Sequence, residues 1–429
     1  MTGSQPADVT VRVRRTARTT QVVFQARNGT PPLRMTLPQP GVMDVARRRL
    51  DAGLLGLKDV LPGLAVDDGD VPEVFDVLHR IGRGLVFLLF GLETGVIQGL
   101  QAFWNAALPV GRNPVLPPPL VECVGDRDCF LPLELLPLHQ MYPTVPADRA
   151  ELVAQCRNLV GFSCVVKRTL LPAPVPTGLS LRPASGGRLP LRFLRHELLS
   201  GARRELDWLT SAAVADRVEV DGPYPGDDTG AATGAATLAE QIFDPRRSLA
   251  GEVRAVPDQI QHFACHCYAT LDSPLDNEIE LHGGGRDLRV KLGTIAEDLV
   301  ALKSRPGHEG GEMPLVVMNA CGSARMHATS SLSFPHLFLT NGNRGFIGSE
   351  IEVPDEVAAA FSQALYERFL LRRLPLGRSV FEARNSLLHT YGNPLGIAYA
   401  AYADPQLHVR TEPTEDADVD LPANRVPAP

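Results

Sequence analysis

Short apolar runs alternate with segments of helical spacing along most of the chain after residue 120. Short apolar runs bounded by polar residues are typical of buried strands, and they occur at Ile260–Ala264, Leu315–Met318 and Gly345–Ile351. Longer amphipathic segments predict helices at Thr294–Leu302, Asp355–Leu370 and Leu376–Leu388. Strands that alternate with helices favour an α/β fold, in which a mostly parallel sheet is flanked by helices on both faces.

The first seventy residues have a pattern of their own. Val9–Val13 and Thr20–Gln25 predict a β-hairpin, and Met43–Val60 has the spacing of a helix. Asp67–Asp70 interrupts this pattern. We therefore expect a small β-containing accessory region at residues 1–70, a main domain at residues 71–410, and a disordered acidic and proline-containing tail at residues 411–429.

The most apolar stretch, Gly84–Leu108, contains Glu93, Gln98 and Gln101. It is not the uninterrupted run of about 20 apolar residues that a membrane span needs, so we interpret it as a core helix. A role in engaging membranes is the minor alternative. Met1–Val9 lacks the apolar core of a signal peptide, so we expect a cytoplasmic protein with no membrane span.

Composition excludes several classes of function. The net charge of −7 argues against direct binding of nucleic acid, which needs concentrated Lys and Arg. The 7 cysteines are an odd number, so we expect reduced thiols rather than a disulfide framework. The phosphate-binding pattern G-x-x-x-x-G-K-[ST] is absent, and we expect no cofactor.

Candidate chemistry lies in two short strings, each of which follows an apolar run. The first is His262–Cys267 and the second is Asn319–Ser323. Sites in mostly parallel sheets form at the carboxyl ends of strands, so His266 and Cys321 are expected to share a site. A thiol nucleophile needs an acid/base and donors for the oxyanion. We assign these roles to Cys321, to His266, and to the backbone amides of Cys267 and Cys321, each of which we expect in a turn after its strand.

The cysteines and histidines of these strings also have structural interpretations. An isolated cysteine at a strand end is most often packed in the core, which is how we interpret Cys265. A metal site is not expected, because Cys265, His266 and Cys267 are adjacent on one strand and cannot converge on a tetrahedral ion. The imidazoles that compete with His266 as base are those of His262, His282, His327 and His336.

These strings, with others in the same order, resemble the CHAT family of caspase-like cysteine peptidases. Upstream, Leu131–Leu136 resembles the family's Pro-x-Glu-Leu-Leu element. Downstream, the resemblance extends to Gly348–Glu356, Pro375–Gly377, Ala383–Asn385 and Tyr402–Pro405. It implies a caspase-like domain within residues 71–410, with His266 as acid/base and Cys321 as nucleophile. Two departures are Cys267, where the family commonly has Gly after the histidine, and Ala403, where Gly is usual.

The resemblance also suggests where substrate specificity lies. Acidic residues on the late strand-to-helix segment line the pocket for the residue before the cut, and the candidates here are Glu350 and Asp355. A buried carboxylate there favours a basic side chain. The alternative for Asp355 is that it caps the helix that follows Pro354.

The function implied is that of a bacterial cysteine endopeptidase with a protein substrate. The family's settings suggest antiphage defence or regulated cell death, with a gasdermin-like pore former as one substrate and with activation by a partner protein or signal. The alternative is a catalytically silent module with the same fold that acts in interaction or regulation.

Overall fold

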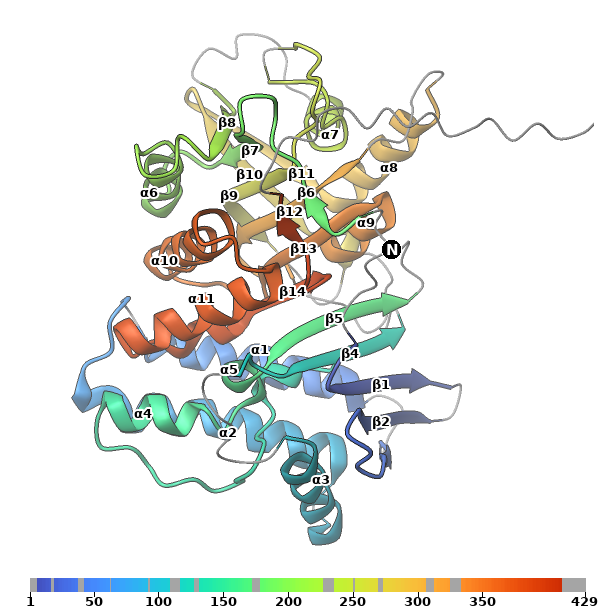
Figure 1. The fold of residues 1–429 in the computed structure, drawn as a ribbon, viewed down its shortest axis with the longest axis vertical. Coiled ribbons are helices and arrows are strands. Elements are labelled where there is room, and N and C mark those ends of the chain that lie inside the picture. Colours follow the sequence, from blue (N-terminus) through green and yellow to red (C-terminus); the bar gives the residue numbers. More distant parts are fainter. Residues whose placement is uncertain are drawn as a thin grey trace, which may run out of the picture.

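The computed structural model describes residues 6–16, 19–37, 42–61, 63–91, 93–108, 116–126, 131–171, 178–226, 235–249, 251–268, 273–305, 312–324 and 333–410. Within these ranges the chain forms two large β-sheets that lie one above the other in Figure 1, each packed against helices. A third sheet consists of only two short strands, β6 (Ser180–Leu181) and β15 (His408–Val409). The predicted tail at residues 411–429 lies outside the described residues.

The first sheet has the strand order β3-β2-β1-β4-β5. Its strands are β1 (Val9–Arg15), β2 (Thr20–Ala26), β3 (Leu33–Thr36), β4 (Leu120–Asp126) and β5 (Val165–Leu171). The predicted hairpin is confirmed, because β1 and β2 pair antiparallel with Val11 opposite Phe24. The other edge of β1 pairs with β4 in parallel. One sheet thus joins residues on both sides of position 70, and the domain boundary proposed there stays a prediction.

Three helices pack beside this sheet: α1 (Val42–Asp59), α2 (Val71–Phe90) and α3 (Thr94–Ala107). Phe24 of β2 makes edge contacts with Phe90, Phe103 and Trp104, so aromatic rings fill the space between strand and helices. The single helix predicted for Gly84–Leu108 is wrong. Gly91 adopts φ 82, a left-handed conformation that ends α2 and starts the turn into α3.

The described residues include no single helix that is both long and apolar enough to cross a membrane. The segments Asp68–Phe90 and Thr94–Ala107 reach the length and apolar composition of a membrane span only when they are taken together, and they are bent by 115° relative to each other.

The second sheet contains the candidate site. Its main path is β8-β7-β9-β12-β13-β14, and the β10–β11 hairpin pairs with the end of β9. The strands are β7 (Leu189–Arg195), β8 (Val218–Tyr224), β9 (Ile260–Tyr268), β10 (Glu278–Gly283), β11 (Arg286–Lys291), β12 (Met313–Ala320), β13 (Asn343–Ser349) and β14 (Tyr399–Ala403). Strands β8 to β13 of the main path are mutually parallel, and β14 is antiparallel to β13.

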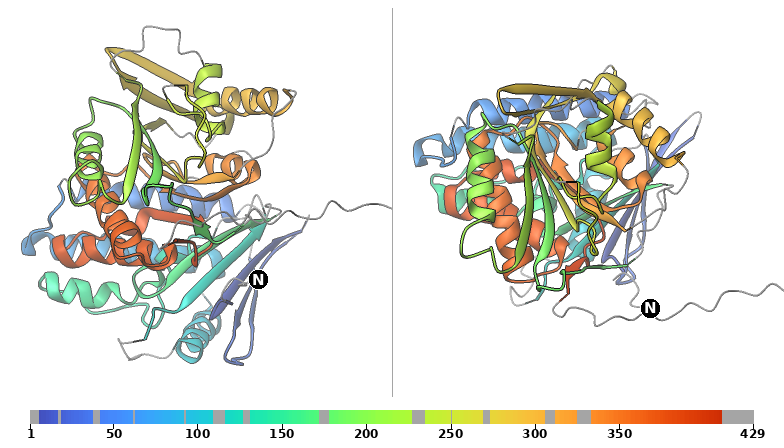
Figure 2. Two further views of the ribbon diagram at one scale, coloured as in Figure 1. Left: turned by 45° about the horizontal axis from the view of Figure 1, so that its top comes forward. Right: turned by 90° about the horizontal axis from the view of Figure 1, so that it is seen from above.

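Helices cover both faces of this sheet, which Figures 1 and 2 show from three sides. On one face lie α6 (Ser200–Leu209), α10 (Asp355–Tyr366) and α11 (Leu376–Tyr391). On the other lie α7 (Ala235–Phe243), α8 (Leu292–Lys303) and α9 (Phe334–Asn341). Phe338 of α9 packs on Phe263 and Phe346 of the sheet, which anchors that layer. The α/β class, with a mostly parallel sheet between two helical layers, is confirmed.

Shorter elements complete the described chain. They are α4 (Arg149–Cys156), α5 (Val160–Ser163), β6 (Ser180–Leu181), β15 (His408–Val409), the π-helical turn η4 (Glu367–Leu371), and the 3-10 turns η1 (Asp68–Asp70), η2 (Leu133–Leu135), η3 (Pro274–Asp276) and η5 (Pro394–Ala398).

Candidate active site

The pairing of β9 with β12 brings His266 and Cys321 to neighbouring positions. These strands are parallel, and the last pairs in their register are Asn319 with Ala264 and Ala320 with Cys265. His266 and Cys321 are the next residue on each strand path, and adjacent strands lie about 4.8 Å apart. Both side chains are half-buried. The predicted meeting of the two strings at one edge of the sheet therefore follows directly from the register.

The two residues differ in local structure. Cys321 lies in the turn that follows β12, as its motif predicts. His266 lies inside β9, which the sequence analysis ended at Ala264. The strand continues to Tyr268 because β10 pairs with it, with Glu280 opposite His266. This pairing also places Cys267 in the strand, opposite Ile279, rather than in the turn that we expected for an oxyanion donor. Its oxyanion role stays a prediction.

The turn at Cys321 is held by hydrogen bonds to the segment after β13. The Gly322 amide donates to the carbonyl of Ile351 at 2.9 Å, and the Ser323 hydroxyl donates to the carbonyl of Met318 at 2.8 Å. The hydroxyl of Ser349 donates to the carbonyl of Ala320 at 3.0 Å. Gly322 has φ 64, a conformation that side-chain-bearing residues rarely adopt, so glycine is required beside the thiol.

The Cys321 thiol is protonated at neutral pH in this structure. Burial raises its pKa to about 11, and the carboxylates of Glu352 and Asp355 act in the same direction. The backbone amide of Val353 and the ammonium group of Lys58 oppose this shift but do not outweigh it. Attack by this thiol therefore needs a base that removes the proton as the bond to sulfur forms.

The pKa of Cys321 gives a paired prediction. Lys58 of α1 lies 3.0 Å from Glu352 and has the opposite effect on the thiol. Because the thiolate is the reactive form, Glu352→Gln is expected to speed alkylation of Cys321 about threefold, and Lys58→Gln to slow it by a similar factor. The rate is measured by iodoacetamide labelling with mass spectrometry at pH 7 to 9. Equal rates in the two variants would contradict this assignment of charges.

The surroundings of His266 include an imidazole that the sequence analysis did not single out. The ring of His196 contacts His266 edge-on with centroids 4.7 Å apart, and Tyr268 stacks beside His266 at 6.1 Å. His196 directly follows strand β7, which runs parallel to β9. The signal was therefore the same as for His266: an imidazole at the carboxyl end of an apolar strand.

A buried polar network fixes the helices against the strand ends. Asn319 donates to Glu205 of α6 at 2.8 Å and to the carbonyl of Ala358 in α10 at 3.0 Å. The hydroxyl of Tyr399 donates to Asn319 at 2.6 Å. Glu205 also lies 2.6 Å from Nε2 of His262. The asparagine of the second motif thus acts as a positioning residue beside Cys321.

The other competing imidazoles occupy different places. His262 is 0% exposed and bound between Glu205 and Tyr366, which removes it from any substrate. His282 lies on β10, and His336 lies in the first turn of α9. His327 lies outside the described residues. Cys265 is 2% exposed, so its predicted place in the core is confirmed.

Glu350 is buried among arginines. It is 3% exposed, and its carboxylate pairs with Arg47 of α1 at 2.5 Å and with Arg168 of β5. Arg168 also pairs with Glu134 at 2.8 Å. These contacts join the first sheet and α1 to the segment that holds the Cys321 turn. They favour a structural role for Glu350, and its predicted role in a substrate pocket stays a prediction.

Asp355 caps a helix, but not its own. Its carboxylate accepts from the Ser200 hydroxyl at 2.8 Å and from the Gly201 amide at 2.6 Å, at the start of α6. Helix α10 begins after Pro354 and has no side-chain cap. The alternative that Asp355 caps α10 is therefore wrong. The carboxylate instead satisfies the Gly201 amide at the N-terminus of α6, where negative charge is favoured.

Comparison with known proteins finds similarity to one protein family and to a small number of proteins. Residues 231–407 match the model of the CHAT domain family. A probable protease from Vitiosangium sp. is 35% identical over 107 residues, which are 25% of this chain and only 14% of that protein. Among solved structures, two of the Saccharomyces cerevisiae separase–securin complex align with TM-scores of 0.40 and 0.41, at 10% and 11% identity, over 94% of this chain and 30% of the matched chain. The matched residues 231–407 contain both His266 and Cys321, and the match agrees with the resemblance to the CHAT family stated above.

Proposed function

We propose that this chain is a cysteine endopeptidase in which Cys321 is the nucleophile and His266 the general acid/base. The observation that carries the proposal is the parallel register of β9 and β12, which ends with Ala320 opposite Cys265 and continues to Cys321 and His266. The match to the CHAT family supports it independently, because it covers both residues.

The reaction follows from these two groups. His266 accepts the thiol proton while the sulfur of Cys321 bonds to the scissile carbonyl carbon, and the resulting oxyanion is met by the amides of Cys267 and Cys321. The tetrahedral intermediate collapses, the C–N bond breaks, and the leaving amine takes the proton from His266. Water then attacks the thioester with His266 as base, which releases the acid and restores the thiol.

The proposal includes a regulated state. The raised pKa of Cys321 describes a thiol with low basal reactivity, which the charges around it can raise or lower. Residues of α1 contact the segment beside it, through Arg47 to Glu350 and Lys58 to Glu352. A protein partner or signal that shifts α1 would change the charge around the thiol. Action in the cytoplasm, in antiphage defence or cell death, and on a gasdermin-like substrate belongs to the same proposal.

A second function has one observation in its favour. A thiol with a pKa of about 11 is a poor nucleophile, which is what a catalytically silent CHAT-fold module would show. The enzyme is preferred because an imidazole occupies the strand position beside the thiol, where a silent module has no need of one.

Labelling with a peptidyl acyloxymethyl ketone tests the assignment of the nucleophile. Cys321 is half-buried, whereas the other described cysteines, at positions 123, 156, 164, 265 and 267, are buried. In a Cys129→Ser background, which removes the cysteine outside the described residues, we expect one adduct, located on Cys321 by mass spectrometry. Iodoacetamide serves as the matched control for simple access. An adduct on another cysteine, or no peptidyl adduct while iodoacetamide modifies Cys321, would refute the proposal.

A further inference from the structure

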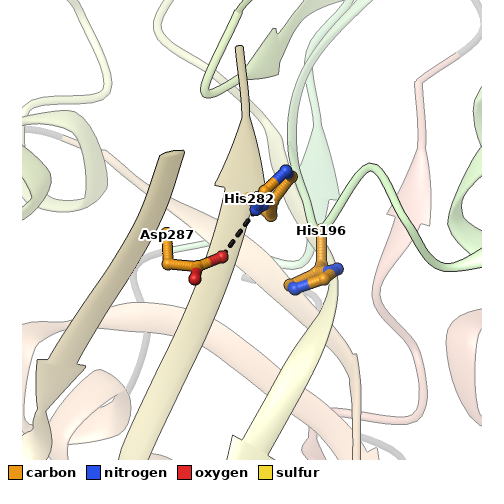
Figure 3. A group of neighbouring side chains, drawn as sticks. All are labelled: His196, His282 and Asp287. Carbon is orange, nitrogen blue, oxygen red and sulfur yellow. Dashed lines mark hydrogen bonds and ion pairs between the residues drawn. The ribbon is translucent and has the colours of Figure 1, made fainter. Parts of the chain in front are cut away.

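Two histidines and an aspartate meet beside the candidate active site, on three different strand paths (Figure 3). His196 follows β7, His282 lies on β10 and Asp287 lies on β11. His196 and His282 form a parallel bridge, and their rings lie 5.2 Å apart. One ligand atom from each of the three side chains lies within 4.8 Å of the other two. The topology therefore converges two imidazoles and a carboxylate on one point.

His196 is the buried member of this group. It is 6% exposed, and its Nδ1 has no hydrogen-bond partner among the described residues. A buried polar atom left unpaired costs about 1–3 kcal/mol, so such atoms are rare unless a ligand or water satisfies them.

The hydrogen bonds of His282 suggest what the ligand is. Its Nε2 lies 3.1 Å from a carboxylate oxygen of Glu197, and its Nδ1 lies 2.6 Å from Oδ1 of Asp287. If Glu197 accepts the ring N–H at Nε2, then Nδ1 presents a lone pair toward the Asp287 carboxylate. Two acceptors that face each other need a cation between them: at 2.6 Å this cation is a proton, and a divalent metal ion would displace it as the two atoms move apart. An imidazole oriented from behind by a carboxylate is the arrangement that metal-binding histidines use.

We propose that His196, His282 and Asp287 bind a divalent transition-metal ion of the zinc class, with Glu197 orienting His282. Two imidazoles and a carboxylate form a recognised ligand set for zinc, which leaves a fourth position for water. Zn–N and Zn–O bonds are about 2.0–2.2 Å, so ligand atoms on a tetrahedral ion lie about 3.3–3.6 Å apart. Atoms that now lie up to 4.8 Å apart would approach by about 1.5 Å, whereas Nδ1 of His282 and Oδ1 of Asp287, now 2.6 Å apart, would separate. Asp287 has a side chain that is 56% exposed, so it has room to make that movement.

The ion would join β7 to the β10–β11 hairpin. That hairpin pairs with the part of β9 that carries His266, and the ring of His196 lies against His266. These ligands differ from Cys265, His266 and Cys267, which are adjacent on one strand and cannot converge on one ion. The proposal concerns binding and stability, and it holds or fails independently of peptidase activity.

Zinc titration of the full chain tests the site. After removal of metal with EDTA and dialysis, we expect one equivalent of Zn²⁺ to bind by calorimetry, Co²⁺ to give the visible bands of a tetrahedral site, and Zn²⁺ to raise the melting temperature. Asp287→Asn and His196→Ala should each weaken binding about 100-fold, and Glu197→Gln about tenfold. His408→Ala, which removes an exposed imidazole on β15, should bind like the wild type.

Two outcomes overturn the proposal. One is the absence of zinc binding, which would mean that His282 is an imidazolium ion paired with Glu197 and Asp287. The other is zinc binding that persists unchanged in both Asp287→Asn and His196→Ala. Because Asp287 is largely exposed, Asp287→Asn keeps the test valid even if His196→Ala does not fold.

Discussion

Arg168→Met is expected to lower the free energy of unfolding by about 3–5 kcal/mol, which is typical for the loss of one partner from a buried ion pair. Arg168 is 7% exposed and pairs with both Glu134 and Glu350, and it donates to the hydroxyl of Tyr402 at 2.9 Å. Methionine fills a similar volume, but it leaves the buried negative charges of Glu134 and Glu350 with fewer positive partners.

The electrostatics of Glu134 show why the arginines matter. Burial by itself opposes its ionisation, but the guanidinium groups of Arg168 and Arg384 outweigh burial and hold its pKa below the ordinary value. This carboxylate therefore contributes stability that is present above its unfolded-state pKa and is lost as pH falls through the lower folded value. Loss of Arg168 removes the larger of the two favourable interactions.

Urea denaturation measures this effect, with Arg204→Met as the matched control. Arg204 pairs with Glu356 at 3.4 Å on the surface, where both side chains are at least half exposed, so its loss is expected to cost less than about 1 kcal/mol. If Arg168→Met does not fold, Glu350→Gln keeps the shape of the side chain and tests the same pair. Equal, small losses in the buried and surface variants would show that the network does not hold the two sheets together.

Cys321→Ala is expected to reduce peptide cleavage to background, and His266→Ala to reduce kcat/KM by about 10²–10⁴-fold. The first change removes the atom that forms the covalent intermediate. The second removes the acid/base that accepts the thiol proton and protonates the leaving amine. General acid/base catalysis typically contributes about 10²–10⁴-fold to the rate. The raised pKa of Cys321 makes this base more important than it is for a preformed thiolate.

Steady-state kinetics on a cleaved peptide give the comparison, with near-UV circular dichroism as the check on folding. His408→Ala removes an exposed imidazole on the short strand β15 and is expected to match the wild type. Full activity in His266→Ala, with the fold intact, would assign the base to another residue.

Local pattern was enough to predict the sheet and the neighbouring positions of His266 and Cys321. Apolar runs marked β9 and β12, and the rule that parallel strands end at one edge brought His266 and Cys321 together. The break at Gly91 was missed because a glycine inside an apolar run carries no local sign of positive φ. The extension of β9 to Tyr268 depends on β10, a pairing that the residues of β9 do not encode.

Long-range polar contacts could not be predicted from the sequence. The ion pair between Arg47 and Glu350 joins residues 303 positions apart, and that between Arg168 and Glu350 joins residues 182 apart. Charge type alone made Glu350 a pocket candidate, because an acidic residue near a site is equally suited to bind substrate or a buried arginine. The contribution of His196 was missed for a similar reason: its partners lie on β9 and β10.

Cleavage profiling with a peptide library tests the central claim, the catalytic pair of Cys321 and His266, most directly. Wild type and Cys321→Ala are incubated with the same library, and the products are identified by mass spectrometry. The account predicts defined cuts by the wild type and none by Cys321→Ala. Identical cuts by both proteins would contradict it, and a wild type that cuts no peptide while iodoacetamide modifies Cys321 would favour the silent module.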